Sequence, residues 1–400
     1  MSEITLEQQL LLYCTKSAIN PEFQPEVTNF LAKEPEINWE NFLKLAQDHR
    51  VIPLVGRSLQ NISPSVVPQA ISQQLAGYVS NQTRQSLLLT RELVNILQLL
   101  EKEQVLAIPF KGACLAAFAY GKIANRTFSD LDILLHRADI PKAIEILLNN
   151  RYRDRYQLTP AEIAERWERH HEWDLIKDNG LVALDLHWGF TERPIYFPLN
   201  LDDLQPRLEP FNLVGKQVLS FSATDTLLIL CVNGSKECWH KLLRICDIAA
   251  LISSHSEIDW EQLLKTATQL GSRRMVFLGL ILAQELMGTV LPELVLKAIE
   301  KDKKGKLLAI EIENRLFLGI DQSLGQVDTS RYYLKMRERW RDRLWYIYHL
   351  VKYSGGLTPS QRDRDLISLP PGLSFFYYFL RPLRVLPKYG RSIIKKRSQN

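Results

Sequence analysis

Two aspartates at the start of an apolar run, Asp130 and Asp132, constrain this chain more than any other feature. Side chains alternate between the two faces of an extended chain, so both carboxylates point the same way while Leu131 and Ile133 point into a core. Paired like charges at the end of a buried strand repel each other. They persist most easily around a divalent cation such as Mg²⁺, which prefers carboxylate and phosphate oxygens. The alternative is a capping residue followed by a solvated acid.

The segment before this pair has the pattern of a strand that enters a helix. An amphipathic helix is predicted from apolar residues at three-to-four spacing, namely Leu89, Leu93, Ile96, Leu97 and Leu100. A short apolar run over 105–108 then leads to Lys111 and Gly112, and small residues over 113–120 predict the next helix. Backbone N–H groups are free at a helix start, which suits a phosphate group. An ordinary turn is the alternative for Lys111 and Gly112.

A β-hairpin is predicted farther along the chain. Strand-like segments over 172–177 and 181–188 flank a turn over 178–180 that contains Asn-Gly, a strong reverse-turn signal. On the second strand Asp185 and His187 share one face, whereas the apolar residues share the other. An acid in the middle of such a strand needs a partner, and a metal held by two other carboxylates would serve. For His187, filling space in the strand is the alternative to binding Asp185 or a nucleotide.

Together these motifs resemble the nucleotidyltransferase superfamily that has the DNA polymerase beta-like catalytic core, and more narrowly its uncharacterised bacterial branch. The residues that carry the resemblance are Lys111-Gly112, Arg126, Ser129-Asp130-Leu131-Asp132 and Leu184-Asp185-Leu186-His187-Trp188. Similarity extends to Trp39, 49–51, 235–242, 246–249 and 258–260, so it covers about residues 35 to 290. The resemblance implies an α+β fold, in which a polymerase-beta-like core with a small mixed sheet is flanked by N- and C-terminal helical regions.

The resemblance also implies a reaction. An enzyme of this kind moves a nucleoside monophosphate from a nucleoside triphosphate such as ATP to an acceptor hydroxyl and releases pyrophosphate. Asp130 and Asp132 would hold two Mg²⁺ ions, with Mn²⁺ as an alternative, and Asp185 would hold the second ion and help to remove the acceptor proton. Two cations ~3.5–4 Å apart stabilise the attacking and leaving oxygens of an in-line displacement. The three aspartates are therefore the expected catalytic and metal-binding residues.

The nucleotide side of the site is expected from the same resemblance. Its predicted nucleotide-binding residues are Lys111, Gly112, Arg126, Ser129 and Lys236, and its predicted supporting residues are His187, Lys241 and Asp247. The superfamily's usual Gly-Ser appears here as Gly112-Ala113. No serine hydroxyl is available there for a phosphate, and Lys111, Arg126 or Lys236 is expected to compensate. A structural salt bridge is the alternative role for Lys236 and Asp247.

Four parts are expected along the chain: an N-terminal helical region over 1–85, the catalytic core over 86–215, a helical domain on the nucleotide or substrate side over 216–325, and a C-terminal helix with a basic, aromatic tail over 326–400. Asn38 and Asp259 are the predicted N-caps of two similar amphipathic helices. One final helix is predicted from Thr329 to about Tyr353. His170 and His171 follow a predicted helix and are interpreted as a surface turn.

Composition and charge narrow the setting and the partners. Five cysteines without paired zinc spacing and a polar, acidic N-terminus predict a cytoplasmic protein with free thiols. No apolar run approaches the ~20 residues that a membrane span needs. The net charge of +5 is concentrated after residue 366, so sequence-specific nucleic-acid binding is not expected. The aromatic residues Phe375–Phe379 are expected to dock on the protein, and weak contact of these residues and the cations with a membrane surface is the alternative.

Three functions remain open at this point. The first is nucleotidyl transfer to a small molecule, or to a protein or RNA as in a toxin or a modifying enzyme. The second is a catalytically silent nucleotide-binding or scaffold protein, against which the presence of all three aspartates argues. The third is a membrane-surface accessory protein of a biosynthetic or toxin–antitoxin cluster, which the basic tail would support.

Overall fold

The computed structural model describes residues 4–33, 36–60, 62, 66–156, 158–317 and 326–353. The chain divides into two compact units, one over 1–192 and 197–338 and the other over 193–196 and 339–400. The sheet and all the predicted site residues belong to the first unit. The predicted basic, aromatic tail, with its docking on the protein or its membrane contact, lies outside the described residues.

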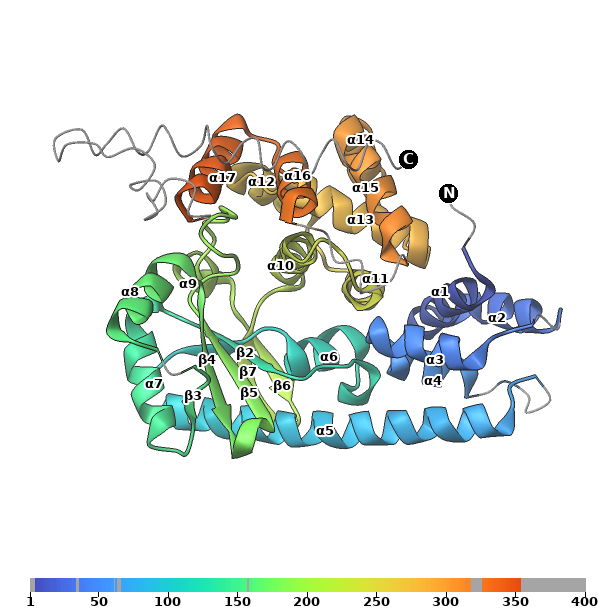
Figure 1. The fold of residues 1–400 in the computed structure, drawn as a ribbon, viewed down its shortest axis with the longest axis horizontal. Coiled ribbons are helices and arrows are strands. Elements are labelled where there is room, and N and C mark those ends of the chain that lie inside the picture. The colour runs from blue at the N-terminus through green and yellow to red at the C-terminus, as the bar shows by residue number, and fades with distance from the viewer. Residues whose placement is uncertain are drawn as a thin grey trace, which may run out of the picture. The chain divides into compact units, whose positions relative to one another are not determined.

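The N-terminal part of the first unit is helical. Its described helices are α1 (Leu6–Ile19), α2 (Gln24–Leu31), α3 (Trp39–Asp48), α4 (Ile52–Leu59) and α5 (Gln69–Lys102), with the 3₁₀ turn η1 (Pro21–Phe23). The first half of α5 packs against α4, where Gly56 leaves room for the side chain of Val79. The second half runs along the sheet (Figure 1). The expected domain boundary after residue 85 therefore falls inside one continuous helix.

A mixed sheet of five strands forms the centre of the first unit. Its strands, in spatial order, are β1 (Ala107–Pro109), β2 (Leu131–Leu135), β5 (Val182–His187), β4 (Glu172–Lys177) and β3 (Arg153–Asp154). β2 and β5 are parallel, whereas the other neighbouring pairs are antiparallel. The predicted hairpin is confirmed as β4 and β5, which are joined by the 3₁₀ turn η4 (Asp178–Gly180).

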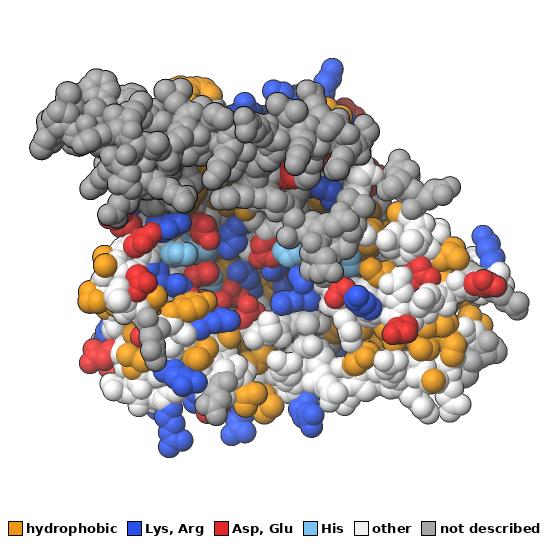
Figure 2. All heavy atoms as spheres, viewed as in Figure 1, with side chains coloured by type: hydrophobic (Ala, Val, Ile, Leu, Met, Phe, Trp, Pro, Cys, Tyr) orange, Lys and Arg blue, Asp and Glu red, His pale blue; other side chains and the backbone are white. Residues whose placement is uncertain are grey.

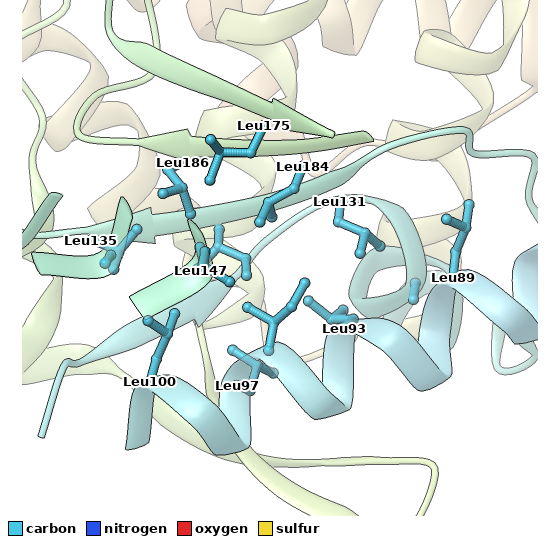
Figure 3. Packing of buried hydrophobic residues seen from close by; sticks show 14 of the residues in the cluster. Leu89, Leu93, Leu97, Leu100, Leu131, Leu135, Leu147, Leu175, Leu184 and Leu186 are labelled. Carbon is cyan, nitrogen blue, oxygen red and sulfur yellow. The ribbon is translucent and has the colours of Figure 1, made fainter. Parts of the chain in front are cut away.

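One face of the sheet is buried against α5 and α7 (Ile140–Leu148). The leucines that meet there are Leu89, Leu93, Leu97 and Leu100 from α5, Leu147 from α7, and Leu131, Leu135, Leu175, Leu184 and Leu186 from the strands (Figure 3). Three-to-four spacing on the helix and alternation on the strands place these side chains on one stripe and one face. Burial of each leucine contributes about 1.5–3 kcal/mol. The opposite face of the sheet carries Asp132, Asp185 and His187.

The remaining elements surround the sheet and extend it into a helical region. Near the sheet lie α6 (Gly112–Tyr120), η2 (Ile123–Asn125), η3 (Arg137–Asp139), α8 (Pro160–Arg169), α9 (Leu201–Leu204), η5 (Gln205–Arg207) and the hairpin β6 (Glu209–Leu213) with β7 (Lys216–Ser220). The helical region comprises α10 (Ala223–Lys236), α11 (Leu242–Ser254), α12 (Trp260–Leu270), α13 (Arg273–Met287), α14 (Glu293–Glu300), α15 (Lys303–Leu316) and α16 (Gln326–Met336). α17 (Trp340–Tyr353) belongs to the second unit.

The expected fold class is confirmed, because a small mixed sheet is flanked by helical regions on both sides along the chain. Both predicted N-caps are confirmed as well. The Asn38 side chain accepts a hydrogen bond from the N–H of Asn41 at the start of α3, and the Asp259 side chain accepts one from the N–H of Gln262 at the start of α12. Among the described residues, none of the helices combines the length and the apolar character that crossing a membrane requires.

The single final helix predicted over 329–353 is wrong, because the structure contains two helices there, α16 and α17. The carbonyl groups of Lys335 and Arg337 accept hydrogen bonds from the Arg274 guanidinium, at 2.8 and 3.3 Å. The carboxylate of Glu338 accepts bonds from two backbone N–H groups at the start of α13. The two carbonyl groups that a continuing helix would use are thus bound to Arg274 of α13, and α16 ends at Met336.

Candidate active site

Asp132 and Asp185 are neighbours across the sheet. The parallel register of β2 and β5 pairs Asp132 directly with Asp185. Register partners on adjacent strands point to the same face, so both carboxylates lie on the side opposite the leucine core. Asp130 precedes β2 by one residue and lines the same cavity as the other two. The structure therefore brings the three predicted aspartates together.

The cavity has a volume of about 170 Å³ and a strongly charged lining. Besides the three aspartates, its described charged residues are Arg50, Lys111, Arg126, Glu172, Lys236, Glu237, Lys241 and Arg244. Figure 2 shows acidic, basic and histidine side chains gathered toward the centre of this face of the molecule. A small cavity with charges of both signs suits a charged ligand with a bound cation better than an apolar ligand.

Asp132 is held by two basic side chains. Its Oδ1 atom lies 2.9 Å from the Nζ of Lys111 and 2.9 Å from the Nε2 of His187. Burial by itself would raise the pKa of the Asp132 carboxyl, but Lys111 and His187 hold that pKa well below its usual range. Burial would likewise lower the pKa of Lys111, but Asp132 more than offsets it and the pKa is raised. Asp132 is therefore ionised, and one of its oxygens is already bound.

Asp185 has the opposite environment. Burial, followed by the neighbouring carboxylates of Asp132 and Glu172, raises the pKa of Asp185 to about 7. Its Oδ1 atom is buried and has no hydrogen-bond partner among the described residues. A buried carboxylate oxygen without a donor is costly unless a proton or a cation joins it. The Oδ1 atom of Asp185 therefore needs a proton or a cation beside it.

A divalent cation fits the donor set around Asp185. Asp132, Asp185 and His187 each offer one ligand atom, and these atoms lie within 4.8 Å of one another. Asp130 lines the same cavity and adds a further carboxylate. Hard cations such as Mg²⁺ and Mn²⁺ prefer carboxylate oxygens, and an ion there would account for the unpartnered Oδ1 of Asp185.

Glu172 and His171 belong to this site although the sequence reading missed them. The Oε2 atom of Glu172 lies 3.2 Å from the Nε2 of His171 and 3.4 Å from the Nδ1 of His187. The interpretation of His171 as part of a surface turn is wrong, because its side chain is buried beside Gly189. The hairpin itself carried a signal for Glu172. Counting outward from the Asn-Gly turn pairs Glu172 with His187 across the two strands.

Gly112 ties the start of α6 to the first aspartate. Its φ is +48°, and a Cβ atom at this position would lie 3.1 Å from the backbone oxygen of Asp130. Only glycine combines this left-handed backbone with such a close approach at low cost. The glycine of the Lys111-Gly112 motif is thus required by the fold, and it brings Lys111 and the N-terminus of α6 to the cavity wall.

Arg126 and Asp247 form a buried ion pair at the cavity. Two nitrogens of Arg126 donate to the two carboxylate oxygens of Asp247 at 2.7 and 2.8 Å, and the hydroxyl of Tyr120 donates to the same carboxylate. The structure thus bears out the structural salt bridge that the sequence left open for Asp247. Arg126 still lines the cavity, whereas Ser129 is exposed and is not among the described lining residues.

The turn between α10 and α11 supplies further charges. Burial, followed by the nearby ammonium of Lys111, lowers the pKa of Lys236, whose Nζ lies 3.4 Å from the Nε2 of His171. Glu237 and Arg244 form a bidentate ion pair beside it. Neither residue was predicted as a site residue, although Glu237 lies in the similar segment 235–242, because their pairing depends on how the chain turns between the two helices.

Comparison with known proteins connects the chain with a protein family. The family is described as "Uncharacterised nucleotidyltransferase", and its sequence model matches residues 35–288, close to the span expected from the motifs. This span includes every cavity residue named above. No curated protein and no solved structure matches the chain in these comparisons.

Proposed function

The chain belongs to the family described as uncharacterised nucleotidyltransferases, and on this basis we propose that its charged cavity transfers a nucleoside monophosphate from a nucleoside triphosphate to an acceptor hydroxyl. Family membership supports nucleotidyl transfer as the class of reaction. The metal, the residues that act and the kind of acceptor are parts of the proposal.

The proposed reaction is a single displacement at the α phosphorus. The acceptor oxygen forms a bond to this phosphorus, and the bond from the phosphorus to the oxygen that bridges it to the β phosphate breaks. The electron pair of that bond leaves with pyrophosphate. The proton of the acceptor hydroxyl passes to the carboxylate of Asp185, which is the role expected for this residue from the resemblance to the superfamily.

Asp130, Asp132 and Asp185 would hold the divalent cation, for which Mg²⁺ is the proposed identity. When bound, such a cation neutralises charge on the phosphates and on the aspartates, which favours attack and departure of the leaving group. Lys111 has a second role in this arrangement. It orients Asp132 through its bond to Oδ1, and its position at the start of α6 lets it face a phosphate group together with Lys236.

One observation carries the proposal: the buried Oδ1 atom of Asp185 has no donor in the part of the chain that the structure describes, and it lies next to the register partner Asp132 in a cavity rich in cationic side chains. A catalytically silent protein would have no need to keep a carboxylate with so high a pKa in a buried position. Nucleotidyl transfer would bring a divalent cation to this carboxylate. It would also bring the phosphates of a nucleotide to the cationic side chains.

The test is the release of pyrophosphate by the full-length protein with Mg²⁺, each nucleoside triphosphate in turn, and panels of hydroxylated small molecules and peptides. Asp185→Asn and Asp132→Asn should each lower the rate at least roughly a hundredfold, since both remove a ligand and a charge. Asp178→Asn makes the same chemical change in the exposed turn of the same hairpin and should leave the rate unchanged. Full activity in Asp185→Asn would refute the proposal.

A further inference from the structure

The cationic side chains of the cavity fall into two groups. Three of them have a carboxylate partner: Lys111 with Asp132, Arg126 with Asp247, and Arg244 with Glu237. For Arg50, Lys236 and Lys241 the described residues include no carboxylate within ion-pair distance. Arg50 differs from the other two because it comes from the N-terminal helices, far from the catalytic strands in the sequence.

Arg50 lies on a turn whose backbone is unusual. It joins α3 to α4, and its φ is +59°, a left-handed conformation that residues other than glycine seldom adopt. Such backbone strain persists where the surrounding structure holds it, and it is often found at ligand sites. Here the strained residue is also a lining residue of the charged cavity.

Contacts with α11 hold this turn in place. The N–H of Leu242 donates to the Nδ1 of His49 at 3.2 Å, and the N–H of Leu243 donates to the carbonyl of His49 at 3.3 Å. Burial, followed by the charge of Lys241, lowers the pKa of His49 to about 4, so its ring is neutral and accepts this bond at physiological pH. The turn before α4 and the start of α11 are thus joined by direct hydrogen bonds.

Lys241 is held by the same turn. Its Nζ donates to the carbonyl oxygen of Asp48 at 3.2 Å, which is a neutral acceptor. Burial, followed by the charge of Arg50, lowers the pKa of Lys241. The carboxylates of Asp48 and Glu237 act on Lys241 from beyond ion-pair distance. The structure therefore holds two cations in one cavity, and neither forms an ion pair with a described carboxylate.

We propose that Arg50 and Lys241 form a phosphate-binding subsite of the cavity. This inference rests on the proposed function and specifies which residues bind phosphate beyond those of the catalytic strands and α6. A guanidinium presents a planar set of donors that matches phosphate oxygens, and an adjacent ammonium adds charge without a directional demand. The phosphate belongs either to the leaving pyrophosphate or to a phosphorylated second substrate.

The experiment measures binding of two probes to the full-length protein by titration calorimetry with Mg²⁺ present. The first probe is inorganic pyrophosphate, and the second is inorganic phosphate added after saturation with pyrophosphate. Arg50→Asn removes the cation with a residue that tolerates the left-handed backbone, and Arg50→Lys keeps the charge. Lys241→Gln tests the second member and serves if Arg50→Asn does not fold. The matched control is Arg57→Asn, an exposed position on α4 outside the charged cavity.

Loss of a charge-assisted hydrogen bond should weaken binding roughly ten- to hundredfold in Arg50→Asn, with partial recovery in Arg50→Lys. Weaker pyrophosphate binding assigns the subsite to the leaving group, whereas a selective loss of the second probe assigns it to the other substrate. Unchanged binding of both probes, or an equal loss in Arg57→Asn, would overturn the inference. Activity of Asp185→Asn tests the proposed function separately, because the subsite can fail while that variant is still inactive.

Discussion

Asp132 and Asp185 are register partners on the parallel strands β2 and β5, yet their carboxyl groups have opposite electrostatic environments. Lys111 and His187 bind Asp132 and hold its pKa well below the usual range. Burial, followed by the carboxylates of Asp132 and Glu172, raises the pKa of Asp185 to about 7, and its buried Oδ1 atom has no donor among the described residues.

The raised pKa of Asp185 makes the stability of the metal-free protein depend on pH. The pKa is about 7 in the folded state and near 3.9 in the unfolded chain, so between these values the folded protein binds more protons. The stabilisation from protonated Asp185 is therefore present at low pH and is lost as pH rises through 7. Relative to Asp185→Asn, the wild-type protein should lose about 3 kcal/mol in unfolding free energy between pH 5 and pH 8.

Urea unfolding in the presence of EDTA at both pH values measures this difference. Saturating Mg²⁺ should restore the unfolding free energy of the wild-type protein at pH 8, since the ion needs the ionised carboxylate. It should leave the unfolding free energy of Asp185→Asn almost unchanged. If the unfolding free energies of the two proteins differed by the same amount at pH 5 and at pH 8, the Asp185 carboxyl would not titrate in this range.

Replacement of Lys111 should destabilise the fold through Asp132. The Lys111 side chain is 14% exposed and that of Asp132 is 6% exposed, so Lys111→Met leaves a buried anion with His187 as its remaining partner. Breaking a buried pair costs about 3–5 kcal/mol, and the double variant Lys111→Met, Asp132→Asn should regain part of the loss. Lys216→Met is the control, because its partner Glu101 is 68% exposed, and it should cost less than about 1 kcal/mol. Equal losses from both lysines, measured by denaturant unfolding, would contradict this account.

Gly112→Ala should reduce activity more than stability. The new Cβ atom would lie 3.1 Å from the Asp130 oxygen, so it would strain the backbone and displace Asp130 from the cavity. Backbone strain at a left-handed position costs about 1–3 kcal/mol, and we expect kcat/KM to fall at least roughly tenfold. Gly121→Ala has a similar φ of +70° with no heavy atom within 4 Å of the added Cβ. Gly121→Ala should therefore lose stability but keep its activity. If its activity fell as much as that of Gly112→Ala, the loss in Gly112→Ala could not be attributed to displacement of Asp130.

Gly234→Ala should disturb the turn that carries the cavity lysines. A Cβ atom on Gly234 would come within 2.3 Å of the ring of Trp239, which is fully buried in this turn and has a φ of +57°. Overpacking of this kind costs about 1–3 kcal/mol, and displacement of the turn should weaken pyrophosphate binding through Lys236. Gly77→Ala in α5 meets no atom within 4 Å and should stabilise the protein by about 0.5–1 kcal/mol. Thermal unfolding and pyrophosphate titration of both variants provide the comparison.

The parts of the site that were predicted correctly are those with local signals. The Asn-Gly turn defines the β4–β5 hairpin, and alternation on β5 separates Asp185 from the leucine core. Both patterns depend on residues a few positions apart, so one chain suffices to recognise them. Glu172 could have been found in the same way, by counting the hairpin register back from the turn.

The errors and omissions concern contacts between distant segments. His171 follows a polar helix and has the pattern of an exposed turn, but packing beside Gly189 buries it. Arg126 was assigned to the nucleotide, and the structure also gives it a buried partner in Asp247. Arg50 was part of a recognised motif, yet nothing around it in the sequence indicates that its side chain lines the cavity.

The sequence by itself determined which residues are acidic, which faces of the strands are apolar, and where glycine permits an unusual backbone. Each of these properties depends on one residue or on residues a few positions apart. Only the tertiary structure decided which carboxylate is bound by basic side chains and which has a buried oxygen without a donor among the described residues. Ionisation depends on burial and on charges within a few ångströms, and here those charges come from the residue before α6, from the aspartates at β2 and from the hairpin. Two aspartates that look equivalent along the chain therefore differ in the folded protein.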